Sequence, residues 1–318
     1  MDIIATLRSI IDFSKVFGVA PFKIIKGNDF NILRVSPKIV LCYKIMFLLI
    51  VIGHLKSYHI YFNTVFKIKE LSSITVLIFD TFLYFTSCLM PYINILIYKD
   101  LICFQINRIS QLNFLRCFKL DSKKLYYINL ILTIVPVFYS LTFLVTTSVF
   151  ALQPFSTGDP AEILYLFLMN INVLADNLLM CQFVIFTNVS RVLYVRLNNI
   201  LGKEIREEFG LKVLLLKIQR LKVEEDILKD ALEAINGMYA FALLLTTCWC
   251  FASFLHSFVM LMGQEAGWFS SATSLVVWII MYCYLIVSVL FICAMTSKEV
   301  VAKCFMLFNL LFKLTHAL

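Results

Sequence analysis

Residues 126–152 read YYINLILTIVPVFYSLTFLVTTSVFAL, which is a stretch of 27 residues without a charged side chain. Crossing a hydrocarbon core about 30 Å thick takes roughly 20 predominantly apolar residues in a helix. Five further apolar stretches reach that length, at about 39–62, 71–98, 161–190, 238–262 and 270–297. The chain is 61% hydrophobic and only 15% charged, which leaves no room for a soluble domain of ordinary size. The sequence therefore predicts an all-α fold, in which residues 1–318 form one polytopic membrane helical bundle with six transmembrane helices.

The basic residues predict the orientation of this bundle. Of the 28 Lys and Arg residues, 24 lie before residue 39, at 99–125, at 191–237 or after 297. The other connections hold only Lys56, Lys67 and Lys69. Cytoplasmic loops carry an excess of Lys and Arg, so both termini are expected in the cytoplasm. The first 30 residues lack an apolar stretch followed by a small-residue cleavage site, so we expect no removable signal peptide.

The segment 191–237 is predicted to be a cytoplasmic helical extension of the bundle. The helix of the fourth span is expected to continue past Arg196, and a second helix is expected to start near Leu211. Apolar residues of this second helix recur every three or four positions, at Leu211, Leu214, Ile218, Leu221, Leu228, Leu232 and Ile235. Glu225 interrupts the row and is predicted to pair with Lys229, four residues on. The row must be buried, either against another helix of the same chain or in a contact between subunits.

Polar side chains inside the spans are the candidates for a binding site, because an Asp at mid-membrane costs roughly 2.5–3.5 kcal/mol on insertion scales. The connections predicted to lie outside are short, at about 63–70, 153–160 and 263–269, so a ligand must enter the bundle itself. With a rise of about 1.5 Å per residue, ten aromatic or polar residues of spans two to six lie about 9–22 Å below the outer surface. The candidate ligand-binding residues are Asp80, Tyr84, Tyr139, Asn172, Asp176, Trp249, Ser253, His256, Trp278 and Tyr282. They predict a pocket with aromatic walls and a few hydrogen-bonding groups; the alternative for each is a structural bond to a neighbour.

Several function classes find no support in the sequence. There is no His/Glu metal motif, no Gly-x-Ser-x-Gly and no phosphate-binding Gly-rich loop, so we expect no enzyme, no metal and no cofactor. No basic run is interleaved with aromatic residues outside the spans, which argues against a nucleic-acid partner. A G-protein-coupled receptor needs an external N-terminus, and a voltage-gated channel needs an arginine-rich fourth span. A secondary transporter that uses Asp80 and Asp176 for ion coupling stays as the alternative.

Several local strings resemble the insect gustatory receptor family. They are RLN at 196–198 followed by Leu201, IN at 235–236 before YAFALL at 239–244, and TSKE at 296–299 leading to LFKL at 311–314. The inverted topology and the long charged helix before the fifth span are also similar to that family. The resemblance covers the whole chain through short, degenerate motifs, and it extends more distantly to the insect odorant receptors.

The resemblance implies a ligand-gated cation channel in the plasma membrane of chemosensory neurons. Such a receptor is a homo- or heterotetramer of related subunits, and it binds a small-molecule tastant in the outer half of the bundle. The family's pore-lining seventh helix carries a Thr-Tyr-(apolar)5-Gln-Phe signature, which this sequence lacks. The apolar part of the last 20 residues, 305–312, is too short to span a membrane. We therefore expect either a truncated sequence or a shortened, non-conducting relative.

Overall fold

A computed structural model describes residues 3–27, 31–65, 71–112, 122–152, 160–206, 211–262 and 286–302, together with residues 276, 280, 283 and 284. Nearly all of these residues are helical. The long helices are α3 (Pro37–Val65), α4 (Leu71–Ser110), α6 (Ser122–Leu152), α7 (Pro160–Arg206) and α8 (Leu211–Met262). A further helical segment covers 286–302. Two short helices and a β-hairpin precede them: α1 (Ile3–Thr6), α2 (Arg8–Val16), β1 (Phe22–Lys26) and β2 (Asn31–Val35).

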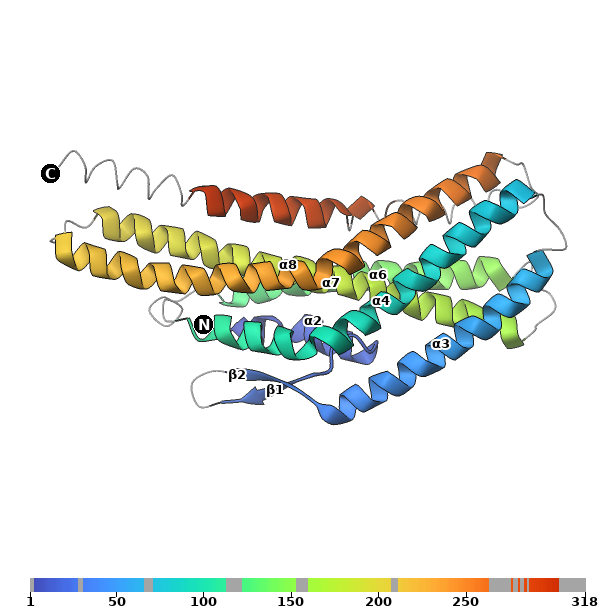
Figure 1. The fold of residues 1–318 in the computed structure, drawn as a ribbon, viewed down its shortest axis with the longest axis horizontal. Helices are drawn as coiled ribbons and strands as arrows, with labels where there is room; N and C mark the ends of the chain where they lie inside the picture. The colour runs from blue at the N-terminus through green and yellow to red at the C-terminus, as the bar shows by residue number, and fades with distance from the viewer. Residues whose placement is uncertain are drawn as a thin grey trace.

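The long helices lie along one axis, and successive helices run in opposite directions (Figure 1). Within the described residues, four segments are long and apolar enough to cross a membrane: Pro37–Lys56, Phe85–Ser110, Ile171–Glu204 and Val213–Ala252. These segments belong to α3, α4, α7 and α8. A helical membrane bundle is thereby supported, while the count of six crossings and the direction of the N-terminus stay predictions.

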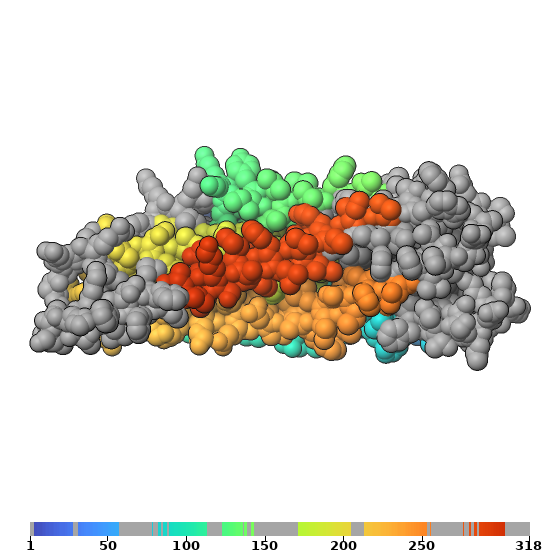
Figure 2. Space-filling model, turned by 90° about the horizontal axis from the view of Figure 1, so that it is seen from above, coloured from blue at the N-terminus to red at the C-terminus, as the bar shows by residue number. Residues whose placement is uncertain are grey.

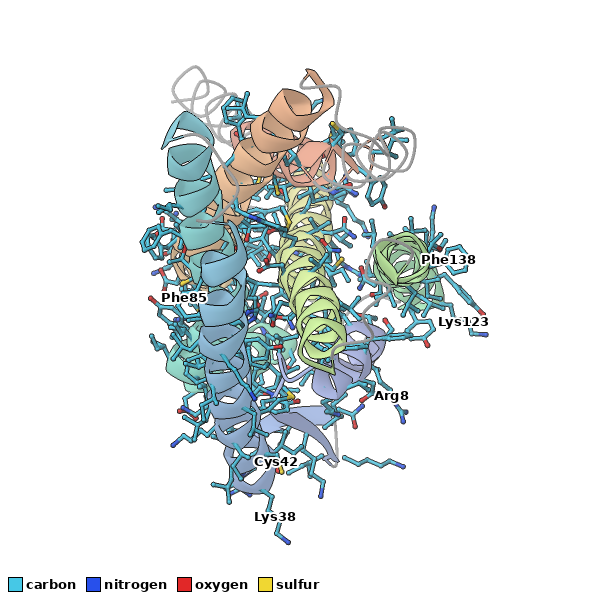
Figure 3. The ribbon with its side chains drawn as sticks, turned by 90° about the vertical axis from the view of Figure 1, so that its right-hand side faces the viewer. Arg8, Lys38, Cys42, Phe85, Lys123 and Phe138 are labelled. Carbon is cyan, nitrogen blue, oxygen red and sulfur yellow. The ribbon has the colours of Figure 1, made fainter. Side chains whose placement is uncertain are left out.

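Helix α7 is the centre of the bundle. In a view along the bundle it lies between α3 and α4 on one side and α6 on the other (Figure 3). In the candidate span of α7, 83% of the apolar stretch is buried inside the protein, whereas in the candidate span of α3 only 22% is buried. The segment 286–302 lies on the surface between α6 and α8 (Figure 2). A hydrogen bond joins this segment to α7, since the side-chain amide of Asn198 donates to the backbone oxygen of Glu299 at 2.9 Å.

The charged segment 191–237 is helical over residues 191–206 and 211–237. α7 runs on to Arg206, and α8 is a single helix from Leu211 to Met262, which joins the predicted extension to the predicted fifth span. Leu214, Leu228 and Ile235 are buried, so the apolar row packs within this chain at those positions. The predicted pair of Glu225 with Lys229 is wrong. Glu225 binds Lys222 at 3.1 Å, and Lys229 lies 3.7 Å from Glu233, because other partners at helical spacing are available on the same face.

The N-terminal unit, which we define as residues 3–36, is the part of the fold that the sequence analysis did not predict. Its helices α1 and α2 bury apolar side chains, and its hairpin pairs Phe22 with Val35 and Ile24 with Leu33 across antiparallel strands. Phe22 and Leu33 are almost fully buried, at 1% exposure each. The inner face of the hairpin therefore belongs to the core of the bundle, and the all-α prediction omits these two strands.

Side chains from the long helices bind the backbone of this unit. The side-chain amide of Asn107 (α4) donates to the backbone oxygen of Leu33 and accepts from its backbone N–H, each at 2.8 Å. These two bonds pair backbone groups at the free edge of β2, which no other strand covers within the described residues. The hydroxyl of Tyr43 (α3) donates to the oxygen of Lys15 at 2.7 Å, and Asn129 (α6) donates to that of Thr6 at 3.2 Å. Gln182 (α7) donates to the oxygen of Val19 at 2.8 Å. Four helices thus hold the unit by direct hydrogen bonds.

Gly18 provides a test of this docking. Its φ of +78° lies in the left-handed region, and a Cβ added there meets the Met46 side chain at 1.9 Å. We expect Gly18→Ala to lower the free energy of unfolding by about 1–3 kcal/mol, the usual range for a strained non-glycine backbone. Thermal denaturation of the purified protein in detergent measures the change.

Gly237→Ala is the matched control, because a Cβ added at this helical glycine meets nothing within 4 Å. Alanine in a helix interior is favoured over glycine by about 1 kcal/mol, so this variant should be as stable as the wild type or more stable. Equal thermal midpoints for the two variants would contradict the docked geometry at Gly18.

Candidate functional site

Asn172 and Asp176 lie one turn apart on α7, and both side chains are 0% exposed. Residues four apart on a helix share one face, so their polar atoms are neighbours. They lie in the half of α7 remote from the N-terminal unit, within the first 17 residues after Pro160 of a helix of 47 residues. We call this pair, together with the side chains that contact it, the polar centre.

Helices α3 and α4 complete the polar centre on one side. The side-chain nitrogen Nδ2 of Asn172 is in hydrogen-bonding contact with Nε2 of His54 on α3, which is also 0% exposed. The imidazole of His54 meets the ring of Phe85 on α4 edge-on, with 6.0 Å between the ring centroids and 82° between the planes. His54 therefore has an aromatic neighbour on one helix and a polar neighbour on another.

The oxygens of the polar centre accept no hydrogen bond from any described residue. Both carboxyl oxygens of Asp176 and Oδ1 of Asn172 are buried without a donor. A buried polar group left without a partner costs about 1–3 kcal/mol. The helix around it is fully packed, because Val173, Ala175 and Leu178 are all buried in the apolar core. Three oxygens on one face thus have no hydrogen-bond donor among the described residues.

Helix α8 presents one further residue of the predicted set, Trp249, to the core. Trp249 is 3% exposed and Thr246, one turn earlier, is 0% exposed, so this face of α8 points into the core. The hydroxyl oxygen of Thr246 also lacks a partner in the described part of the chain. On α4, Ser87 and Asn94 are buried in the same way. Four helices therefore bring polar or aromatic groups into the interior of the bundle.

The rest of the predicted set cannot be compared with the structure. The side chains of Asp80, Tyr84, Tyr139, Ser253 and His256 lie outside the described part, although their backbones are helical. Trp278 and Tyr282 lie outside the described residues altogether. Of the ten candidates, the structure thus places Asn172, Asp176 and Trp249 in the interior, and it brings the first two together on one helix face.

His54 is the residue of the polar centre that the sequence analysis missed. It lies in the part of the predicted first span that approaches the same end of the bundle as Asn172. A titratable imidazole in an apolar stretch is itself a signal of a polar interior.

A second buried polar contact lies further along α7. Tyr239 of α8 donates to Oε1 of Gln182 at 2.9 Å, while Nε2 of the same amide donates to Val19. Gln182 follows Asp176 by six residues, a rise of about 9 Å along the helix. One rigid helix therefore carries the polar centre and, below it, the hydrogen bonds that hold the N-terminal unit and α8.

Within the described residues, no group of three or more His, Cys, Asp or Glu side chains is arranged to hold a metal ion. What the polar centre offers is acceptor oxygens inside an apolar bundle. A small molecule with O–H or N–H donors would satisfy them, and apolar neighbours would bury the remainder of its surface.

Two comparisons with known proteins bear on this chain. The curated proteins compared with it give no match. The family described as 7tm Chemosensory receptor matches residues 7–317, almost the whole chain, which confirms the family resemblance seen in the sequence. The protein belongs to the 7tm chemosensory receptor family.

Proposed function

We propose that this protein is a gustatory-type chemosensory receptor subunit in the plasma membrane. A small tastant binds at the polar centre, and binding opens a cation-conducting pore formed with related subunits in a tetramer. The N-terminus lies in the cytoplasm, as the distribution of Lys and Arg predicts. Family membership supports the chemoreceptor role, and the three oxygens of Asn172 and Asp176 that have no donor among the described residues are the observation that carries the site.

The chemistry of the polar centre constrains the ligand. Acceptor oxygens call for donors, which both a polyhydroxylated molecule and a protonated amine provide. A ligand donor that pairs with a buried oxygen replaces the hydrogen bonds with water that the oxygen lost on burial. We therefore expect compounds with free O–H or N–H groups to activate the receptor at lower concentrations than their alkylated counterparts.

Ligand-evoked current in cells that express the full chain, alone and with related subunits, tests this proposal. Sugars and amines, each paired with an O- or N-methylated analogue, form the panel. The expected result is an inward cation current that the parent compounds evoke at lower concentrations. Trp249→Ala should raise the half-maximal ligand concentration by about tenfold or more, since a buried aromatic contact contributes on the order of 1.4 kcal/mol or more to binding.

Surface expression, measured on the same cells, separates loss of binding from loss of protein. Tyr127→Ala is a matched control on α6, because that aromatic side chain is 60% exposed. If Trp249→Ala reaches the surface and responds like the wild type, the pocket does not include α8 at this level.

The alternative function is a secondary transporter that couples uptake to an ion gradient. The buried, unpartnered carboxyl of Asp176 favours it, since ionisable residues inside membrane spans also mark ion pathways. Substrate uptake that follows a proton or sodium gradient, without ligand-evoked current, would establish the carrier and overturn the receptor. Asp80, the other aspartate assigned to this role, has its side chain outside the described part of the structure.

A further inference from the structure

The outer face of the β1–β2 hairpin combines features that its fold alone does not explain. In the antiparallel register Lys23 lies directly opposite Arg34, and Ile25 lies opposite Ile32. Alternate residues of a strand share a face, so these four side chains form one surface, which we call the hairpin outer face. Its two isoleucines are 37% and 40% exposed, and both basic residues are exposed.

Like charges directly opposite each other destabilise a strand pair, because the Cβ atoms are only about 4.5–5.5 Å apart. Neither Lys23 nor Arg34 has a carboxylate partner within the described part of the chain. On α2, by contrast, Arg8 and Lys15 both bind Asp12, at 3.3 and 2.8 Å. The hairpin outer face therefore concentrates unneutralised positive charge beside exposed apolar surface.

The position of the hairpin indicates which partner neutralises the positive charge of its outer face. β2 ends at Val35, and the candidate membrane span of α3 begins at Pro37. Lys38, in the first turn of α3, is exposed and projects away from the bundle (Figure 3). Leu41 and Ile45, further along α3, are 60% and 53% exposed, as expected of side chains that face lipid. The basic residues thus lie where a lipid-facing helix surface begins.

We propose that the hairpin outer face, with Lys38, binds the phosphate-containing headgroups of anionic lipids at the membrane surface. Arg34 and Lys23 form one cationic pair that a phosphate bridges. The negative surface of the cytoplasmic leaflet attracts juxtamembrane basic residues by about 1 kcal/mol each. Because the N-terminal unit is hydrogen-bonded to α3, α4, α6 and α7, lipid binding there stabilises the packed bundle.

Thermal denaturation of the purified full chain in lipid nanodiscs tests this proposal. One set of discs contains phosphatidylcholine alone, and the other contains phosphatidylcholine with phosphatidylserine. The thermal midpoint of the wild type should be higher with phosphatidylserine, and added salt should reduce that difference by screening. Lys23→Gln/Arg34→Gln should lose most of the difference. In phosphatidylcholine alone, the same double variant should be at least as stable as the wild type, since a like-charge pair has been removed.

Arg220→Gln/Lys229→Gln is the matched control, because it removes the same charge from exposed positions of α8. It should keep the wild-type response to phosphatidylserine. The proposal is overturned if the wild type melts at the same temperature in both lipids, or if the hairpin double variant keeps the full difference. The assay uses neither tastant nor current, so its outcome does not depend on the proposed function.

Discussion

Asp176→Leu is expected to raise the stability of the protein and to abolish its response to ligand. Leucine has nearly the shape of aspartate and removes two buried oxygens that accept no hydrogen bond from the described residues. Removing an unsatisfied buried group should raise the free energy of unfolding by about 1–3 kcal/mol. The same change deletes the acceptors that the ligand needs. Thermal denaturation in detergent and ligand-evoked current measure the two effects on one variant.

Asp226→Leu is the matched control for this substitution. Its side chain is 55% exposed and lies 3.0 Å from Lys222 in the helical extension, so no buried penalty is removed. Exposed ion pairs contribute about 0–1 kcal/mol, and this variant should not gain stability. A destabilised Asp176→Leu protein would show that the carboxyl has a structural partner, and the argument for a ligand site at the polar centre would fail.

Tyr239→Phe is expected to lower the free energy of unfolding by about 1–3 kcal/mol, because it leaves Oε1 of the buried Gln182 without its donor. The ring itself stays packed, since Phe183 and Phe186 lie 5.8 and 6.1 Å from it by ring centroid. The loss is therefore that of one hydrogen bond and not of a cavity. Thermal denaturation in detergent provides the measurement.

Tyr127→Phe serves as the control, since Tyr127 is 60% exposed and its hydroxyl can bind water. A double-mutant cycle with Gln182→Leu measures the interaction between the two side chains directly. Once the amide has been removed, Tyr239→Phe should cost much less, so the two changes should not be additive. Additive losses would mean that the two side chains act independently, and the hydrogen bond between them would carry no weight in stability.

The helices could be predicted from the sequence because an apolar stretch of this length has few other ways to satisfy its backbone in a membrane. The predicted ends were less accurate. α4 continues to Ser110, twelve residues past the predicted boundary at 98. Residues 99–110 contain no glycine or proline that would end the helix, and leaving the membrane does not by itself end one. The hairpin was missed although Phe22, Ile24, Leu33 and Val35 alternate with polar residues, since strands of five residues give a weak signal beside spans of more than twenty.

The candidate site was predictable in part. The burial of Asn172, Asp176 and Trp249 follows from the cost of facing lipid with a polar or amphipathic side chain. Sequence spacing alone cannot say which helices are neighbours, and for that reason His54 was not connected with Asn172. The pairing depends on α3 packing against α7, a tertiary contact that no periodicity within one helix encodes.

Coupling from the site to the remainder of the molecule has a physical route along α7. The helix carries Asn172 and Asp176 and, near its middle, Gln182, which makes the hydrogen bonds to Val19 and Tyr239. A ligand that moves or tightens α7 would act on both the N-terminal unit and α8 through those bonds. Evidence for such coupling requires a ligand response that Tyr239→Phe alters while the ligand affinity of the polar centre is retained.

The central claim is that the oxygens of Asp176 and Asn172 bind the tastant. The most direct measurement is a cryo-electron microscopy map of the full chain with its subunit partners and an agonist identified by its current. Binding at the polar centre should give agonist density between α3, α4 and α7, with a donor atom within about 3.2 Å of an Asp176 oxygen. Agonist density elsewhere in the bundle, with the Asp176 oxygens facing only protein, would contradict it.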